Sequence, residues 1–260
     1  MTPKQLARLG VGALLLAETS ARKAIAKAVE THVDNAAAEL QRRKDNERKA
    51  AALVLLLGGA RAMSEDVRAA IVAGRKEARE AARRRLNAEL KTAGIVIEAH
   101  EWVVGNRMPE DTAHAASAAE SLAGQWRGLA IAVTLAAKRK ETSAASEVST
   151  TIRPMRARIE RTATSEIAQA YNDEHVAALR DIVEHDRAYR DGELADRIET
   201  QLARQWSALV DACERCWPLD GVTVGINESF PGGDEPGSMH IRCRCIDVLV
   251  EASESSRLAA

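Results

Sequence analysis

Four cysteines and one histidine near the end of the chain have the types and spacing of metal ligands. Two residues separate Cys213 from Cys216, an arrangement that lets two thiolates from a tight turn bind one tetrahedral ion. A second group follows in the segment His240-Ile-Arg-Cys243-Arg-Cys245. These residues predict a structural metal ion, for which Zn²⁺ is the expected identity.

The stretch between the two groups favours the same interpretation. Residues 217–239 are rich in glycine and proline and contain too little apolar material for an independent core. Metal binding can supply the missing folding free energy, since small zinc peptides gain roughly 10 to 16 kcal/mol in apparent terms. The alternative is that the cysteines are buried free thiols or form a disulfide.

Five candidate ligands compete for the four positions of a tetrahedral ion. If residues 243–245 are extended, alternation puts Cys243 and Cys245 on one face, and His240 lies outside the coordination sphere. If the chain turns there, His240 pairs with one of the two cysteines. We expect Cys213, Cys216, His240 and one of Cys243 or Cys245, and the sequence leaves that last choice open.

The pattern favours a structural ion over a catalytic one. A hydrolytic zinc keeps an open position, whereas four soft ligands fill the coordination sphere. The chain has neither the deaminase pattern of His-x-Glu followed by Pro-Cys-x-x-Cys, nor a phosphate-binding glycine loop, a Gly-x-Ser-x-Gly elbow or a His-Glu-x-x-His helix. We therefore expect no enzyme, no catalytic residues and no cofactor beyond Zn²⁺.

The rest of the chain has the composition of long helices. Apolar residues make up 46% of the sequence but aromatic residues only 3%, so a large sheet would lack the side chains that usually fill it. The predicted fold is mainly α, with long amphipathic helices and a small C-terminal zinc-stapled α+β lobe. The predicted regions are helical residues 1–150, a long helix and a connecting helix at 151–210, the lobe at 211–250 and a flexible tail at 251–260.

Glycine, proline and capping residues predict where the helices begin and end. The first helix starts at Pro3 and ends, after interruptions, at Gly58 and Gly59. The next helix starts at Ser64 and stops at Gly94. Three more are expected at 110–147, 155–188 and 193–210, with a helix boundary at Pro154, and a strand is expected at 246–250.

Charge gives a weaker signal than the cysteines do. The strongest basic run is Arg83-Arg84-Arg85, but glutamates interleave with it, so a solvent-exposed face of mixed charge is expected there. Residues 190–260 carry seven arginines, no lysine and thirteen acidic residues. A zinc-containing DNA-binding module is one alternative, and a zinc-dependent hydrolase or nuclease is a second.

The hydropathy of the sequence is used to predict the cellular compartment of the protein. No segment approaches the roughly 20 apolar residues of a membrane helix, and the first residues lack the pattern of a signal peptide. The sequence therefore predicts a soluble chain made in a reducing cytoplasm, where clustered cysteines bind metal more often than they form disulfides.

The C-terminal motifs also occur together in a known family. The shared positions are Trp206, Asp211, Cys213, Cys216, Leu219-Asp220-Gly221, Phe230, Pro236, His240 and Cys243-Arg244-Cys245. Upstream, Arg161-Thr-Ala-Thr-Ser-Glu166-Ile-Ala-Gln-Ala-Tyr171-Asn172 is similar to a family helix that reads Ala-Arg-Thr-Glu-x-x-x-Ala-Tyr-Asn. Over residues 150–250 the chain thus resembles phage Mu F-like head morphogenesis (minor head) proteins.

The resemblance implies a role in the virion. Such a protein is made in the bacterial host, incorporated in several copies during capsid assembly and located in the phage head near the portal. Its implied partners are portal and capsid proteins, and contact with packaged DNA, during packaging or ejection, is left open.

Overall fold

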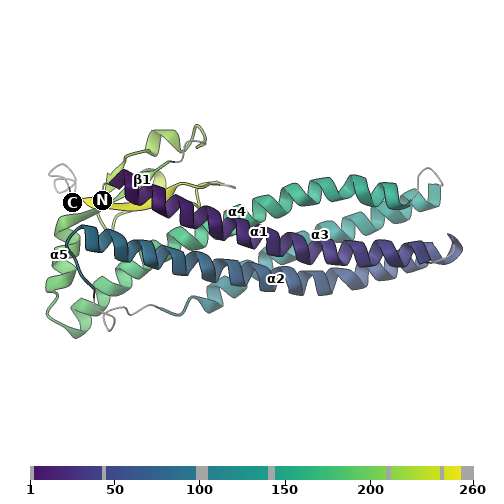
Figure 1. The fold of residues 1–260 in the computed structure, drawn as a ribbon, viewed down its shortest axis with the longest axis horizontal. Helices are drawn as coiled ribbons and strands as arrows, with labels where there is room; N and C mark the ends of the chain where they lie inside the picture. Colours follow the sequence, from purple (N-terminus) through teal and green to yellow (C-terminus); the bar gives the residue numbers. More distant parts are fainter. Residues whose placement is uncertain are drawn as a thin grey trace. The chain divides into compact units, whose positions relative to one another are not determined.

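The structure is a computed structural model that describes residues 3–42, 45–97, 105–139, 144–208, 212–240 and 243–252. It is mainly helical with a small C-terminal antiparallel sheet, which confirms the predicted fold class (Figure 1). The helices are α1 (Pro3–Arg42), α2 (Asp45–Thr92), α3 (Met108–Arg139), α4 (Ala144–Tyr189) and α5 (Glu193–Gln201). The remaining elements are β1 (Leu202–Ser207), η2 (Trp217–Leu219), β2 (Thr223–Val224), η3 (Pro231–Gly233) and β3 (Ile246–Glu251).

The chain divides into two compact units. Unit 1 comprises Met1–Glu18, Arg75–Arg107 and Thr164–Ala260, and unit 2 comprises Thr19–Gly74 and Met108–Ala163. Helices α1, α2 and α4 contribute residues to both units. No helix in the described part of the chain is both long and apolar enough to cross a membrane.

Unit 2 is a helical bundle with an alanine-rich core. Its larger buried side chains are Ile25, Val29, Met63, Val67, Ile71, Leu122, Trp126 and Ile159. The predicted break between Gly58 and Ser64 is wrong, because α2 runs through this segment without interruption. Two glycines cost about 1 kcal/mol each in a helix, and the buried residues on either side of Ser64 keep one helical face packed, which outweighs that cost.

Two further predicted boundaries are corrected by α4. The helix starts at Ala144 and passes through Pro154, where the sequence predicts a boundary. A proline inside a helix costs about 3 kcal/mol. The long buried face that begins at Ile159 and continues to Val183 outweighs this local cost. The helix predicted at 110–147 is correspondingly divided, with α3 ending at Arg139.

Gly94 ends α2, as predicted, and its backbone explains why. Its φ of 75° lies in the left-handed region, which glycine enters without strain. The Gly94 N–H donates to the Lys91 carbonyl at 3.1 Å, and the Ile95 N–H donates to the Leu90 carbonyl at 2.8 Å. Ile95 and Leu90 are both buried in the core of unit 1, so the turn also packs.

Helices α2 and α4 are joined in unit 1 by buried ion pairs. Arg75 contacts Glu166 at 2.8 Å, and the buried Glu174 contacts Arg79 at 3.2 Å and Arg83 at 2.6 Å. The predicted solvent-exposed face is therefore wrong for Arg85, which is buried, and for the half-buried Arg83, whereas Arg84 is exposed. The carboxylate partners lie about 90 residues away in the sequence, so they do not appear in the local charge pattern.

The sheet has the strand order β2-β1-β3, with both pairs antiparallel. Strand β1 replaces the last part of the helix that is predicted at 193–210, since α5 stops at Gln201. All six residues of β1 pair with β3, from Leu202 opposite Glu251 to Ser207 opposite Ile246. The predicted strand at 246–250 is confirmed. The tail beyond residue 252 lies outside the described residues.

Candidate metal centre

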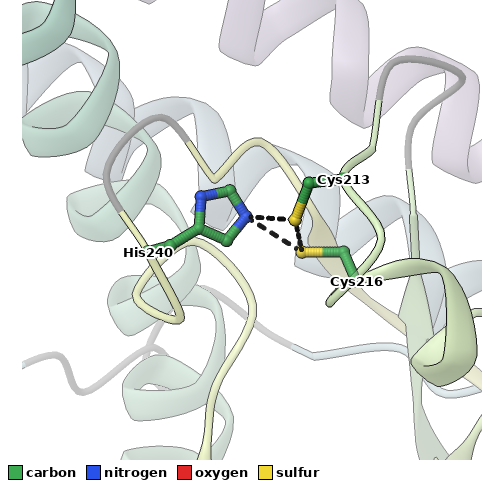
Figure 2. Close-up of side chains that lie close together, drawn as sticks. All are labelled: Cys213, Cys216 and His240. Carbon is green, nitrogen blue, oxygen red and sulfur yellow. Dashed lines mark hydrogen bonds between the residues drawn. The ribbon is translucent and has the colours of Figure 1, made fainter.

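Three of the predicted ligands meet at one point. The Nε2 atom of His240 lies 3.1 Å from the Sγ atoms of both Cys213 and Cys216, and these sulfurs are 3.7 Å apart (Figure 2). Around a tetrahedral zinc with bonds of about 2.3 Å to sulfur, two sulfurs stand about 3.8 Å apart. The imidazole is nearer than the roughly 3.5 Å of a zinc site, so binding would move it outward by about 0.4 Å. These side chains can hold a metal ion.

The other two cysteines complete the cluster. The Sγ atoms of Cys216 and Cys243 are 3.9 Å apart, and the sulfurs of Cys216, Cys243 and Cys245 all lie within 4.8 Å of one another. Cys216 is therefore common to both groups of ligands. The structure brings together all five residues that the sequence selects.

Short turns orient the ligands at both ends of the cluster. The N–H groups of Cys216 and Trp217 donate to the Cys213 carbonyl at 2.9 and 3.1 Å, and helix η2 begins at Trp217. In the second group the Cys243 N–H donates to the His240 carbonyl at 3.0 Å. This hydrogen bond brings the backbone of Cys243 close to that of His240. Both His240 and the Cys243–Cys245 pair lie beside Cys216, so the cluster contains the ligands of both alternatives.

Hydrogen-bond donors lower the pKa of two of the cysteines, Cys213 and Cys243. Burial alone would raise the pKa of Cys213, but the N–H groups of Cys216 and Arg215 lower it overall. Interactions with the Cys245 thiol and with the backbone N–H groups of Cys245 and Gly237 lower the pKa of Cys243 to about 5. Because the thiolate is the metal-binding form, these sulfurs are prepared for a cation.

The pKa values of the other two thiols, Cys216 and Cys245, are raised. Burial and the neighbouring Cys243 raise the pKa of Cys216 to about 12. The hydrogen bond with Cys243, followed by burial, raises the pKa of Cys245 well above its ordinary value. A cation placed among the four sulfurs would reverse these shifts, because it stabilises every thiolate that faces it.

Apolar side chains cover the cluster. Trp206 and Phe230 pack edge to face with ring centroids 5.3 Å apart, and both are buried against Cys216, Cys243 and Cys245. Trp206 comes from β1, the central strand, so the sheet fixes one wall of the site. This small core, together with the ligands, is what orders the loop-rich segment.

Arg204 anchors the same lobe from within the sheet, and the sequence does not reveal its role. It is fully buried on β1 and donates to Asp247 at 2.7 Å and to the Glu228 carbonyl at 2.9 Å. It also pairs with Glu235. A buried arginine with these partners ties the loop after β2 to β3.

Asn172 of α4 holds the lobe against the helix. Its Oδ1 atom accepts the Asp247 N–H at 3.0 Å, and its Nδ2 group donates to the Cys245 carbonyl at 3.1 Å. One bond is made to the second cysteine of the Cys243–Cys245 pair, and the other is made to the second residue of β3. The helix surface therefore helps to set the position of Cys245.

Two carboxylates between the cysteine groups, Asp220 and Glu228, accept hydrogen bonds from the backbone. Asp220 accepts the Ala208 N–H at 2.8 Å, and Glu228 accepts the Gly225 N–H at 2.7 Å. Neither contact places an oxygen in the two groups of residues that can hold an ion. The ligand set is therefore made of thiols and an imidazole, which suits a soft or borderline cation.

We predict that Gly237→Ala lowers the free energy of unfolding by about 3 kcal/mol. The loss has two causes, a left-handed backbone that alanine adopts with strain and a steric clash of the new Cβ. Gly237 has a φ of 83°, and a Cβ there would lie 2.6 Å from Asn172 Nδ2 and 2.9 Å from the Ala168 carbonyl oxygen. Urea unfolding measures the loss. The matched control is Gly233→Ala, which has a similar φ of 75° but no neighbour within 4 Å. Equal losses in the two variants would contradict the close approach.

Comparison of the chain with protein-family models, with curated proteins and with solved structures gave no match. A functional assignment for this chain therefore rests on its own residues and their geometry.

Proposed function

We propose that the chain is a non-enzymatic phage head morphogenesis protein of the Mu F-like type, with a C-terminal lobe that a structural zinc ion holds together. The observation that carries the proposal is the convergence of the residues on which the resemblance rests. Cysteines and a histidine from two separate segments meet in one cluster, and Trp206 and Phe230 cover it.

The proposed ligands of this ion are Cys213, Cys216, His240 and Cys243. The distances from Cys216 to Cys213 and to Cys243, 3.7 and 3.9 Å, are close to the sulfur separation of about 3.8 Å in a tetrahedral site. Cys243 shares only Cys216 with the group formed by Cys213, Cys216 and His240, so binding would draw the Cys243 sulfur toward the other two ligands. Cys243 is preferred to Cys245 because its sulfur lies 3.9 Å from that of Cys216 and its backbone N–H donates to the carbonyl of His240. Three thiolates and an imidazole fill the four positions and leave none for a substrate, which favours a structural role.

The helix signature of the resemblance supports the same assignment. Glu166 pairs with Arg75 of α2, and the Tyr171 ring lies 5.4 Å from the Arg85 guanidinium carbon. Asn172 binds the backbone next to Cys245. The residues of this signature thus join α4 to a second helix and to the lobe, a structural use that fits a scaffold component of a particle.

The DNA-binding alternative has less support from the described residues. Arg204 is buried among carboxylates, and Arg244 contacts Glu18 at 3.2 Å. Arginines engaged in this way are poorly placed to contact phosphates, and acidic residues predominate over residues 190–260.

The proposal is tested by association with capsid components. We predict that the full-length chain co-sediments with purified portal protein from the same phage, and that it is present in heads assembled with it. A gel shift with duplex DNA over a salt series is run in parallel. Absence of the chain from assembled heads, with no binding to portal or capsid protein, would contradict the proposal, and a salt-dependent shift would favour the DNA-binding module instead.

A further inference from the structure

Cys245 is left over when one zinc ion takes four ligands. Its side chain is only 2% exposed, and its sulfur lies within 4.8 Å of the sulfurs of Cys216 and Cys243. A spare buried thiol this close to two bound thiolates has either to stay protonated or to bind a cation of its own.

The indole of Trp206 provides a buried hydrogen-bond donor next to these thiols. Trp206 is fully buried against Cys216, Cys243 and Cys245, and its Nε1 donor has no hydrogen-bond partner of normal geometry within the described residues. A buried N–H without a partner is costly, and a thiolate at Cys245 would satisfy it.

We propose that the cluster binds a second thiophilic d¹⁰ cation, such as Zn²⁺ or Cd²⁺, on Cys216, Cys243 and Cys245. Cys216 and Cys243 would bridge the two ions, and the inference rests on the zinc site proposed above. In a three-coordinate site with bonds of about 2.3 Å, two sulfurs stand about 4.0 Å apart, close to the 3.9 Å between Cys216 and Cys243.

Charge and ligand softness favour the second ion. Three thiolates around a single divalent cation leave one net negative charge in a buried site, whereas four thiolates around two divalent cations are neutral. The thioether of Met239 lies 3.7 Å from the Cys216 sulfur and adds to the soft surroundings. No oxygen ligand is needed, so the site selects thiophilic metals over Mg²⁺ or Ca²⁺.

The test is a titration of the metal-free full-length chain with Cd²⁺ under reducing conditions. Thiolate-to-metal charge-transfer absorbance follows binding, and native mass spectrometry counts the ions per chain. We expect two Cd²⁺ ions on the wild type, with absorbance still rising during the second equivalent. Cys245→Ser is expected to stop at one ion, and the control Ser238→Ala, an exposed loop position, is expected to keep two.

The outcomes separate this inference from the proposed zinc site. Saturation of the wild type at one ion would overturn the second site and leave the first intact. Loss of all binding in Cys245→Ser would also overturn it, because Cys245 would then be a ligand of the first ion. A wild-type chain that binds no ion would refute the zinc site itself.

Discussion

Removing the metal from the C-terminal cluster is expected to unfold the loop-rich residues 212–240 and to leave unit 2 folded. This segment depends on the ligands and on the small core around Trp206, whereas β1 and β3 also place Leu202 and Leu249 in the core of unit 1, and unit 2 has its own buried core with Trp126. Zinc sites contribute roughly 10 to 16 kcal/mol to folding, as much as the whole stability of a typical domain. Hydrogen exchange read by mass spectrometry should show lost protection in 212–240 and retained protection around residues 115–126.

A matched pair of variants sharpens this prediction. Cys213→Ser removes a proposed ligand of the first ion and should reproduce the effect of metal removal, even with zinc present. Cys245→Ser removes a thiol outside that ligand set and should keep the lobe protected. A metal-free chain whose lobe exchanges as slowly as that of the zinc-loaded chain would contradict the structural role of the ion.

The sequence predicts the cluster of cysteines and histidine well because part of its signal is local. Two residues separate Cys213 from Cys216, so a single turn fixes their geometry whatever the rest of the chain does. The choice among His240, Cys243 and Cys245 depends on the backbone conformation of residues 243–245. The hydrogen bond from the Cys243 N–H to the His240 carbonyl is a feature of the folded chain that spacing alone does not reveal.

Strand β1 shows where local patterns fail. Leu202 to Ser207 follow a good helix and contain no β-branched residue, so the sequence predicts that the helix continues through them. The segment is a strand because β3, more than forty residues later, pairs with all of it, and because buried Arg204 meets Asp247 on that partner. Pairing and burial of this kind outweigh intrinsic propensity.

The contact between the lobe and α4 could not be predicted either, because it joins residues that are far apart in the sequence. Asn172 and Cys245 are 73 residues apart, and nothing in the sequence near either residue indicates the other. Gly237 looks like one more loop glycine, although a side chain there would collide with Asn172. The sequence thus predicts residue types that bind metal, and the tertiary structure supplies the contacts that hold them.

The buried network between α2 and α4 leads to the second large prediction. The Glu89 carboxylate accepts a hydrogen bond from Arg85 at 2.9 Å and contacts His175 Nε2 at 2.6 Å. The side chains of Arg85 and His175 are both buried. We expect Glu89→Gln to lower the free energy of unfolding by roughly 3 to 5 kcal/mol at neutral pH. The cause is that the Arg85 guanidinium would remain buried without a carboxylate in contact.

This loss should depend on pH in a defined direction. Burial alone would raise the pKa of Glu89, but the charges of Arg85 and His175 outweigh it and lower the pKa. A carboxyl whose pKa is lower in the folded state stabilises the fold above its unfolded value of about 4.3, and this contribution disappears as the pH falls through the folded pKa. The difference between wild type and Glu89→Gln should therefore be largest at neutral pH and shrink in acid.

Urea unfolding of both proteins over a pH series measures this difference. The metal ligands also take up protons in acid, so the two proteins are compared at each pH rather than across the series. Glu80→Gln is the control, because Glu80 lies exposed on the same helix and its loss should change stability little at any pH. If Glu89→Gln were as stable as Glu80→Gln at neutral pH, the Glu89 carboxylate would not be what balances the buried Arg85 charge.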